Sequence, residues 1–76
     1  MASKAKRWKY FVGVYEDGDI KYVTETKGTY ASWEAGKEAK EFSKVSADEI
    51  CMGLNFNMIH SVVVKAPTFL SFRNDD

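Results

Sequence analysis

The sequence is poor in the residues that most often carry catalysis or bind metal ions. Among its 76 residues it has one histidine, His60, and one cysteine, Cys51. A lone cysteine cannot form an intrachain disulfide and is typical of a reducing compartment. A metal site needs several histidine, cysteine or carboxylate groups that converge. The sequence therefore predicts no metal site, no cofactor and no enzymatic activity.

One route to catalysis would join these two residues, with His60 as the base that activates Cys51 as a nucleophile. Activated thiols favour helix N-termini and positively charged surroundings. Cys51 instead follows Asp48 and Glu49 inside a predicted helix. We therefore expect an inert, buried thiol and a histidine with an ordinary structural role at the start of a strand.

Long apolar runs and a signal-peptide pattern are also missing. No apolar run approaches the roughly 18–20 residues of a membrane span, and no apolar segment follows the charged N-terminus. Acidic and basic residues balance, with eleven of each, whereas nucleic-acid binders usually carry a basic excess across the domain. These features predict a soluble, cytoplasmic protein that does not enter a membrane.

Although the net charge of the chain is zero, its N-terminal arm is basic. Residues 1–10 contain no acidic residue and four basic ones, namely Lys4, Lys6, Arg7 and Lys9. Aromatic residues interrupt this basic stretch from Trp8 onward. Basic residues interleaved with aromatic ones can neutralise phosphates and stack on bases. The arm therefore supports an alternative hypothesis, in which the chain binds nucleic acid through these residues and the hairpin that follows.

What the sequence does have is apolar and aromatic residues, 45% and 14% of the chain. This content is sufficient for a packed core, and the length allows one domain. We place the domain at residues 7–72, between a flexible arm at 1–6 and a flexible tail at 73–76. A domain this small cannot cover all its large side chains, so self-association as a homodimer is plausible.

Two aromatic and β-branched segments, at residues 7–15 and 20–26, predict a β-hairpin around Asp17-Gly18. A three-residue loop that pairs Val14 with Ile20 collects most apolar side chains on one face, and we expect that register. The face so formed contains Trp8, Tyr10, Val12, Val14, Ile20 and Tyr22.

Helices are predicted at residues 33–42, from apolar residues at helical spacing, and from Ser46, where Ser46 to Glu49 form a capping box. Gly36 weakens the first helix, and Gly53 could let the second lie close to the sheet. Residues 29–33 fit either a short third strand or a helix start. Residues 59–65 predict a closing strand that ends before Pro67.

The predicted fold class is α+β, with an antiparallel hairpin or three-stranded sheet, one or two helices packed on one face and a closing C-terminal strand. The expected core comprises Tyr10, Val12, Val14, Ile20, Tyr22, Trp33, Ala39, Phe42, Ile50, Leu54, Val62 and Val64. Helices on one face leave the other face to water or to a partner. We therefore expect an interaction surface formed by Phe11, Tyr15, Lys21 and Val23.

Residues 30–43, YASWEAGKEAKEFS, and 46–54, SADEICMGL, resemble short uncharacterised proteins of Gram-positive bacteriophages and prophages. This resemblance implies a small accessory or host-interacting protein, with a strand at residues 30–33. The order of a hairpin at 9–26 and a helix at 34–42 is similar to the DNA-binding modules appended to phage integrases, where a sheet enters the major groove. The basic residues that such a sheet needs are mostly missing from this chain.

Two functional hypotheses follow. The first is a non-enzymatic protein-interaction domain, which binds another protein or a second copy of itself through an apolar face. The alternative is nucleic-acid binding through the basic arm and the hairpin.

Overall fold

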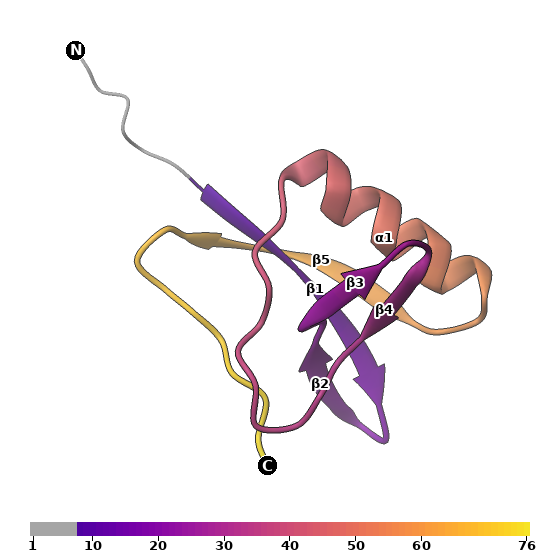
Figure 1. Cartoon of the computed structure of the whole chain (residues 1–76), viewed down its shortest axis with the longest axis horizontal. Coiled ribbons are helices and arrows are strands. Elements are labelled where there is room, and N and C mark those ends of the chain that lie inside the picture. Colours follow the sequence, from indigo (N-terminus) through magenta and orange to yellow (C-terminus); the bar gives the residue numbers. More distant parts are fainter. Residues whose placement is uncertain (1–7) are drawn as a thin grey trace.

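The computed structural model describes residues 8–76, so the predicted arm at residues 1–6 lies outside the described part of the chain (Figure 1). The fold is α+β, with five strands in two antiparallel sheets and one helix. In chain order the elements are β1 (Trp8–Glu16), β2 (Asp19–Tyr22), β3 (Glu25–Lys27), β4 (Tyr30–Ser32), α1 (Lys44–Phe56) and β5 (Ser61–Pro67).

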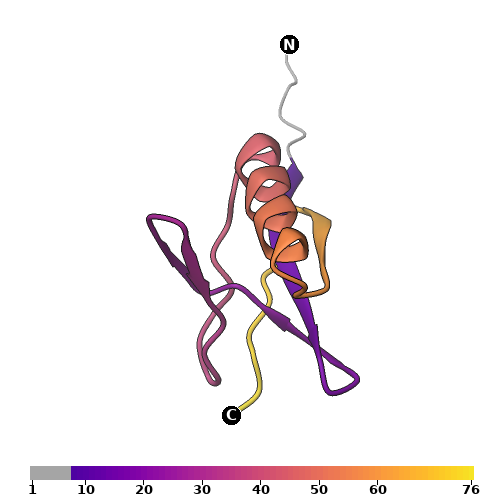
Figure 2. The same ribbon diagram turned by 90° about the vertical axis from the view of Figure 1, so that its right-hand side faces the viewer.

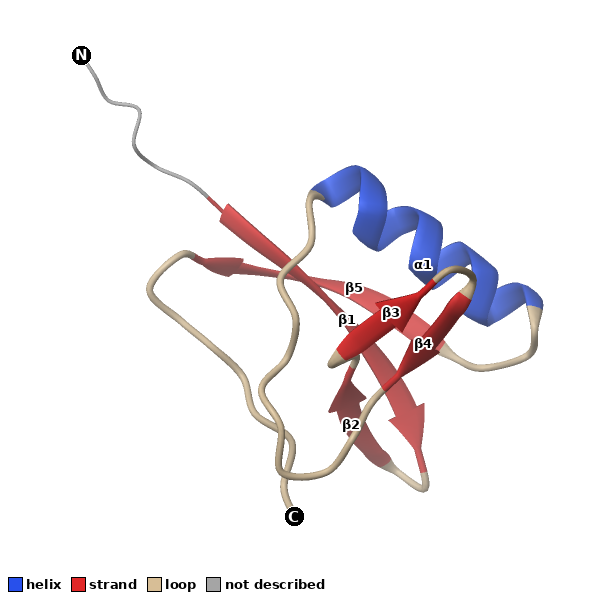
Figure 3. Cartoon of the chain, viewed as in Figure 1, coloured by secondary structure: helices blue, strands red, loops and turns tan. Residues whose placement is uncertain are grey.

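The main sheet has the strand order β2-β1-β5, and both neighbours run antiparallel to the central β1 (Figure 3). β1 pairs with β5 from Trp8 to Val14 and with β2 over its last four residues. The predicted hairpin and closing strand are therefore confirmed. The third strand of this sheet is β5, because residues 30–32 form β4 and pair with β3 in a separate sheet.

The β1–β2 hairpin closes in a two-residue turn, Asp17-Gly18. Both residues have positive φ, 51° and 84°, as in a type I′ turn, whose twist matches that of antiparallel strands. Tyr15 therefore pairs with Ile20. The expected three-residue loop, which pairs Val14 with Ile20, is wrong, because turn geometry outweighs the collection of apolar side chains on one face.

This difference of one residue moves every β2 side chain to the opposite face of the sheet. Ile20 and Tyr22 lie on the face that carries Phe11, and Lys21 lies on the face that carries Val14. The face of Phe11 is consequently more apolar than predicted, and it needs a cover.

The C-terminal segment supplies this cover. The ring of Phe72 meets the ring of Phe11 edge-on, with 5.1 Å between centroids, and stacks on Tyr22 at 4.7 Å. Two residues further on, Asn74 is only 5% exposed. Its Oδ1 accepts a hydrogen bond from the Tyr22 backbone N–H (2.8 Å), and its Nδ2 donates to the carbonyls of Tyr22 (2.9 Å) and Glu34 (3.0 Å). Residues 73–76, expected to be a flexible tail, thus include a buried and fully bonded side chain.

We expect Asn74→Ala to lower the free energy of unfolding by about 2–3 kcal/mol, because it removes three partly buried hydrogen bonds to the backbone of Tyr22 and Glu34. Urea denaturation measures this change. Asp75→Ala is the matched control, since the Asp75 side chain is exposed, and it should change stability by no more than about 0.5 kcal/mol. Equal, small effects of both substitutions would contradict the structural role of Asn74.

The segment between β4 and α1 is extended rather than helical, so the helix predicted at 33–42 is wrong. Gly36 has a φ of 74°, in the left-handed region that ends helices. Beyond it, the chain hydrogen-bonds to strand edges instead of to itself. The N–H of Phe42 donates to the Tyr10 carbonyl (2.8 Å), and the N–H of Lys40 donates to the Val23 carbonyl (2.9 Å).

Gly36→Ala distinguishes the observed loop from the predicted helix. In a helix, alanine would raise stability by about 1 kcal/mol. At positive φ it is strained, and we expect the free energy of unfolding to fall by about 1–2 kcal/mol. Urea denaturation gives the sign, and circular dichroism at 222 nm should show no gain in helix. A more stable, more helical variant would favour the sequence-based prediction.

The helix α1 starts at Lys44, with Ser43 as its N-cap, because the Ser43 side chain accepts a hydrogen bond from the Ser46 N–H (3.2 Å). The capping box predicted from Ser46 is therefore wrong by three residues, almost one turn. α1 packs on β1 and β5, and its side chains of Ala47 and Leu54 are buried.

The core lies between α1 and the main sheet. Its buried residues are Val12, Val14, Val23, Ala47 and Leu54, and its partly buried members are Tyr10, Ala31, Trp33, Phe42, Ile50, Ile59 and Val63. The predicted core is wrong at Ile20 and Tyr22, which lie on the opposite face, and Ala39 is not part of this cluster. It is also wrong for the closing strand, where Val63 takes the place expected for Val62 and Val64, because Val63 pairs with Val12.

The second sheet is a two-stranded hairpin, β3–β4, with Gly28 at positive φ in its turn. It stands beside α1, on the side away from β5 (Figure 2). A two-stranded ribbon is marginally stable alone. Ala31 and Trp33 anchor this one, since both pack against the buried cluster.

Candidate interaction surface

The interaction surface predicted from the sequence does not form a patch. The exposed fractions of Phe11 and Val23 are 2% and 0%, so neither can contribute to a contact surface in this fold. Tyr15 is exposed on the face of Phe11, and Lys21 lies on the other face. The four residues are separated because the two-residue turn shifts the pairing of β1 and β2 by one residue from the predicted register. In addition, Phe72 covers part of the face.

The residues of the alternative nucleic-acid hypothesis lie mostly outside the described part of the chain, which begins after Lys4, Lys6 and Arg7. The ammonium group of Lys9 donates a hydrogen bond to the Leu70 carbonyl (2.9 Å). The indole of Trp8 has the ammonium of Lys65 over its ring, 4.6 Å from the centroid. One face of the indole is thus already engaged within the chain, and nucleic-acid binding stays a prediction.

The thiol and the imidazole have different neighbours. The Cys51 sulfur accepts hydrogen bonds from Asn55 Nδ2 and Ser61 Oγ, both at 3.4 Å. The ring of His60 packs on Tyr15 with 4.8 Å between centroids. Within residues 8–76, no hydrogen bond joins Cys51 to His60, and no group of three or more histidine, cysteine or acidic side chains could hold a metal ion.

α1 has a polar side, which faces the edge of β5. Asn55 bonds both backbone groups of Ser61, accepting from its N–H and donating to its carbonyl, each at 3.1 Å. Asp48, which lies about two helical turns before Asn55, forms an ion pair with Lys44 at 3.0 Å. The hydrogen bond to Asp48, together with its negative charge, raises the pKa of Lys44. The polar and charged side chains on this side of the helix favour contact with water.

The exposed side of α1 next to this polar side is apolar. Val45, Met52 and Phe56 share one row at helical spacing, with the exposed Glu49 between Val45 and Met52, and we call these three residues the outer stripe. Their side chains are largely exposed, reaching 70% for Met52 and 86% for Phe56. Met58, two residues after the end of α1, is also exposed. α1 thus carries a second apolar row, in addition to the one that it buries.

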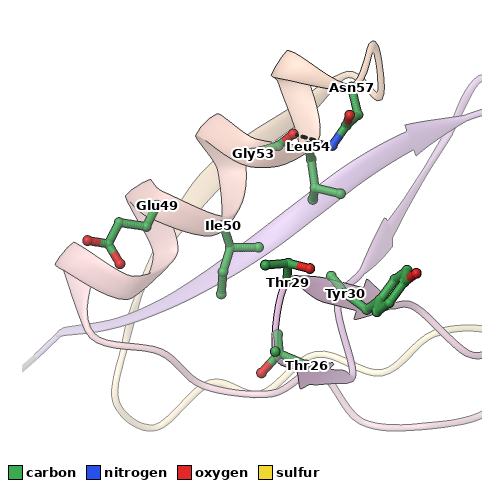
Figure 4. Close-up of a pocket in the computed structure, with 10 residues that line it drawn as sticks. Thr26, Thr29, Tyr30, Glu49, Ile50, Gly53, Leu54 and Asn57 are labelled. Atoms are coloured by element: carbon green, nitrogen blue, oxygen red, sulfur yellow. Dashed lines mark hydrogen bonds between the residues drawn. The ribbon is translucent and has the colours of Figure 1, made fainter.

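A groove of about 370 Å³ lies between α1 and the β3–β4 hairpin, and borders the outer stripe (Figure 4). The floor and the helix wall are apolar, with Ile50, Gly53 and Leu54. Tyr30, which is 79% exposed, stands on the hairpin wall. The polar groups Glu49 and Asn57 lie toward the two ends of the groove (Figure 4). Apolar walls with a few polar groups at the rim are typical of protein interfaces and ligand sites.

Gly53 lies in the wall of the groove that α1 forms, and the packing of this chain does not explain why this residue is a glycine. A Cβ placed on it would meet nothing within 4 Å, so the prediction that it lets α1 lie close to the sheet is wrong. Glycine in a helix interior costs about 0.5–1 kcal/mol relative to alanine. Gly53 therefore makes the isolated fold less stable than alanine would. The open space beside its backbone forms a notch in the groove wall.

We expect Gly53→Ala to raise the free energy of unfolding by about 0.5–1 kcal/mol, because alanine restricts the unfolded chain and meets no neighbour. Thermal or urea unfolding at low protein concentration measures this. Gly18→Ala is the control, since Gly18 has positive φ and the same substitution should destabilise there. A loss of stability in Gly53→Ala would show that something in the fold already occupies the notch.

Sequence reasoning missed the outer stripe and the groove. The signal for the stripe was present, because Val45, Met52 and Phe56 cannot lie on the same side of a helix as Ala47 and Leu54. The groove could not have been found, since it depends on how far the β3–β4 hairpin stands from α1.

Comparison with known proteins gives no relative that could assign a role to this surface. No protein-family model, no curated protein and no solved structure matches the chain. Among residues 8–76, no helix is long and apolar enough to cross a membrane. The function must therefore be inferred from the shape and chemistry of the surface.

Proposed function

We propose that this chain is a small, non-enzymatic protein-interaction domain, which binds its partner through the outer stripe of α1 and the adjoining groove. The supporting observation is the exposure of Met52 and Phe56 on α1, next to a groove that Tyr30 and Gly53 line. Large contiguous apolar patches are rare on monomeric proteins and commonly mark binding sites. The resemblance of residues 30–43 and 46–54 to phage proteins leads us to propose an accessory role in a phage or prophage.

The composition of this surface favours a protein partner. Methionine and aromatic side chains are enriched in the centres of protein interfaces, where they supply large and adaptable contact areas. Met52, Phe56 and Tyr30 are of these types. An amphipathic helix or an extended segment with one large apolar side chain could fill the groove and cover the stripe.

The same surface is poorly suited to phosphate. Of the described residues that line the groove, Glu49 alone carries a charge, and that charge is negative. The nearby ammonium of Lys44 is paired with Asp48 on the other side of the helix. Nucleic-acid affinity comes mainly from basic groups that neutralise phosphates, so binding of nucleic acid here would require contacts from elsewhere in the chain.

A photo-crosslinking amino acid at position 52 tests this proposal in the cells that encode the protein. We expect a covalent protein adduct after irradiation, because position 52 lies in the interface. The matched control is the same amino acid at position 69, which is also well exposed but lies on the loop after β5, away from α1, and should give little adduct. The substitution Phe56→Ser, combined with the probe at position 52, should reduce the adduct at least several-fold.

The same controls define the results that would contradict this proposal. If positions 69 and 52 crosslink equally, or if position 52 gives no protein adduct, the outer stripe is not the binding surface. Recovery of nucleic acid with the purified protein, at a level that Phe56→Ser does not change, would favour the alternative hypothesis.

A further inference from the structure

We infer that the partner on this surface is a second copy of the chain, and that two α1 helices cross antiparallel at Gly53. The inference rests on the proposed function and names its partner. It begins from the unexplained glycine, because an open backbone in a helix wall allows another backbone to approach closely.

A two-fold axis beside Gly53 gives a self-complementary contact. In an antiparallel pair of helices, Phe56 of one copy lies level with Ile50 of the other along the helix axis, since these residues are equally far from Gly53 in opposite directions. Each copy thus offers a projecting ring next to a groove and receives the ring of its partner. A closed dimer of this kind uses the same patch on both copies and leaves no site free for further growth.

The groove suits an aromatic ring. Its volume of about 370 Å³ is at the lower end of the range for binding sites, and Tyr30 on the hairpin wall can meet an incoming Phe56 ring edge-to-face. The polar ends match as well, because Asn57 of one copy lies opposite Glu49 of the other. The Asn57 amide already donates one N–H to the Gly53 carbonyl (3.0 Å), and its second N–H is of the type that a carboxylate accepts.

The exposed apolar area is large enough for a dimer. Tyr30, Met52, Phe56 and Met58 are each at least 70% exposed. Together they present roughly 500–800 Å² per copy, if each side chain offers about 150–250 Å² when fully exposed and about four-fifths of that here. A standard stable interface buries about 800 Å² per partner. The formal net charge of zero adds no general repulsion between copies.

The free edge of β5 is a less suitable place for two copies to pair. Asn55 occupies both backbone groups of Ser61 at the start of this edge. Lys65 and Pro67 stand further along it, and lysine and proline are residues that protect sheet edges from pairing. The side of α1 next to this edge is polar. Association through the outer stripe and groove therefore has fewer obstacles.

Sedimentation equilibrium of the full chain, from micromolar to near-millimolar concentration, tests the inference. We expect the mass to approach twice 8.6 kDa at the upper end. Phe56→Ser and Gly53→Leu should each weaken dimerisation at least tenfold, the first by removing the inserted ring and the second by filling the notch. Phe69→Ser is the matched control, because Phe69 is as exposed as Phe56 (83% against 86%) but lies outside the stripe and the groove, and it should change the dissociation constant less than about twofold.

Gly53→Ala separates interface damage from misfolding. It should weaken dimerisation while it stabilises the monomer, a combination that a folding defect cannot produce. Circular dichroism of every variant should match that of the wild type.

The outcomes distinguish this inference from the proposed function. A chain that stays monomeric throughout, but crosslinks from position 52 to a protein of another mass, contradicts self-pairing and leaves the interaction domain in place. A monomer that gives no adduct contradicts both. A dimer that Phe56→Ser and Gly53→Leu do not weaken uses another surface and overturns the inference.

Discussion

The register of the main sheet is the constraint on which the rest of the structure depends. Two residues with positive φ, Asp17 and Gly18, close the β1–β2 hairpin and decide which side chains share a face. Because Tyr22 falls on the face of Phe11, that face has to be covered, and Phe72 covers it by contacting both rings. Asn74 then fixes the covering segment to the backbone of β2 and of the β4–α1 connection. α1 is left to cover only the other face.

A single 13-residue helix covers that face with one of its two apolar rows. The second row, the outer stripe, has no place in the core, because the β3–β4 hairpin stands beside α1 without closing over it. The outcome is an apolar groove with exposed aromatic and methionine side chains on both borders. A fold this small has few ways to bury large side chains within one copy, so the remaining apolar surface is the feature of this chain that most needs a partner.

The sequence was sufficient to predict the α+β class, the first hairpin and the closing strand, since these follow from alternating β-branched residues and an Asp-Gly turn. It was insufficient where local and long-range interactions compete. Residues 33–42 have helical apolar spacing, but Gly36 and the free edges of β1 favour an extended path. The burial of Asn74 could not be foreseen, because its partners, Tyr22 and Glu34, are distant in the chain. The candidate site depends on the same kind of long-range placement, and only its helical row was present as a sequence pattern.

The central claim is that the outer stripe of α1 is covered in the working state of the protein. Oxidative footprinting of the full chain, in dilute solution and in the cells that encode it, measures this coverage at single residues, because solvent-exposed methionine reacts readily. The account predicts that Met52 and Phe56 are strongly protected in the cell, while Phe69, exposed at a distant loop, reacts equally in both conditions. Equal oxidation of Met52 in both conditions would contradict the account.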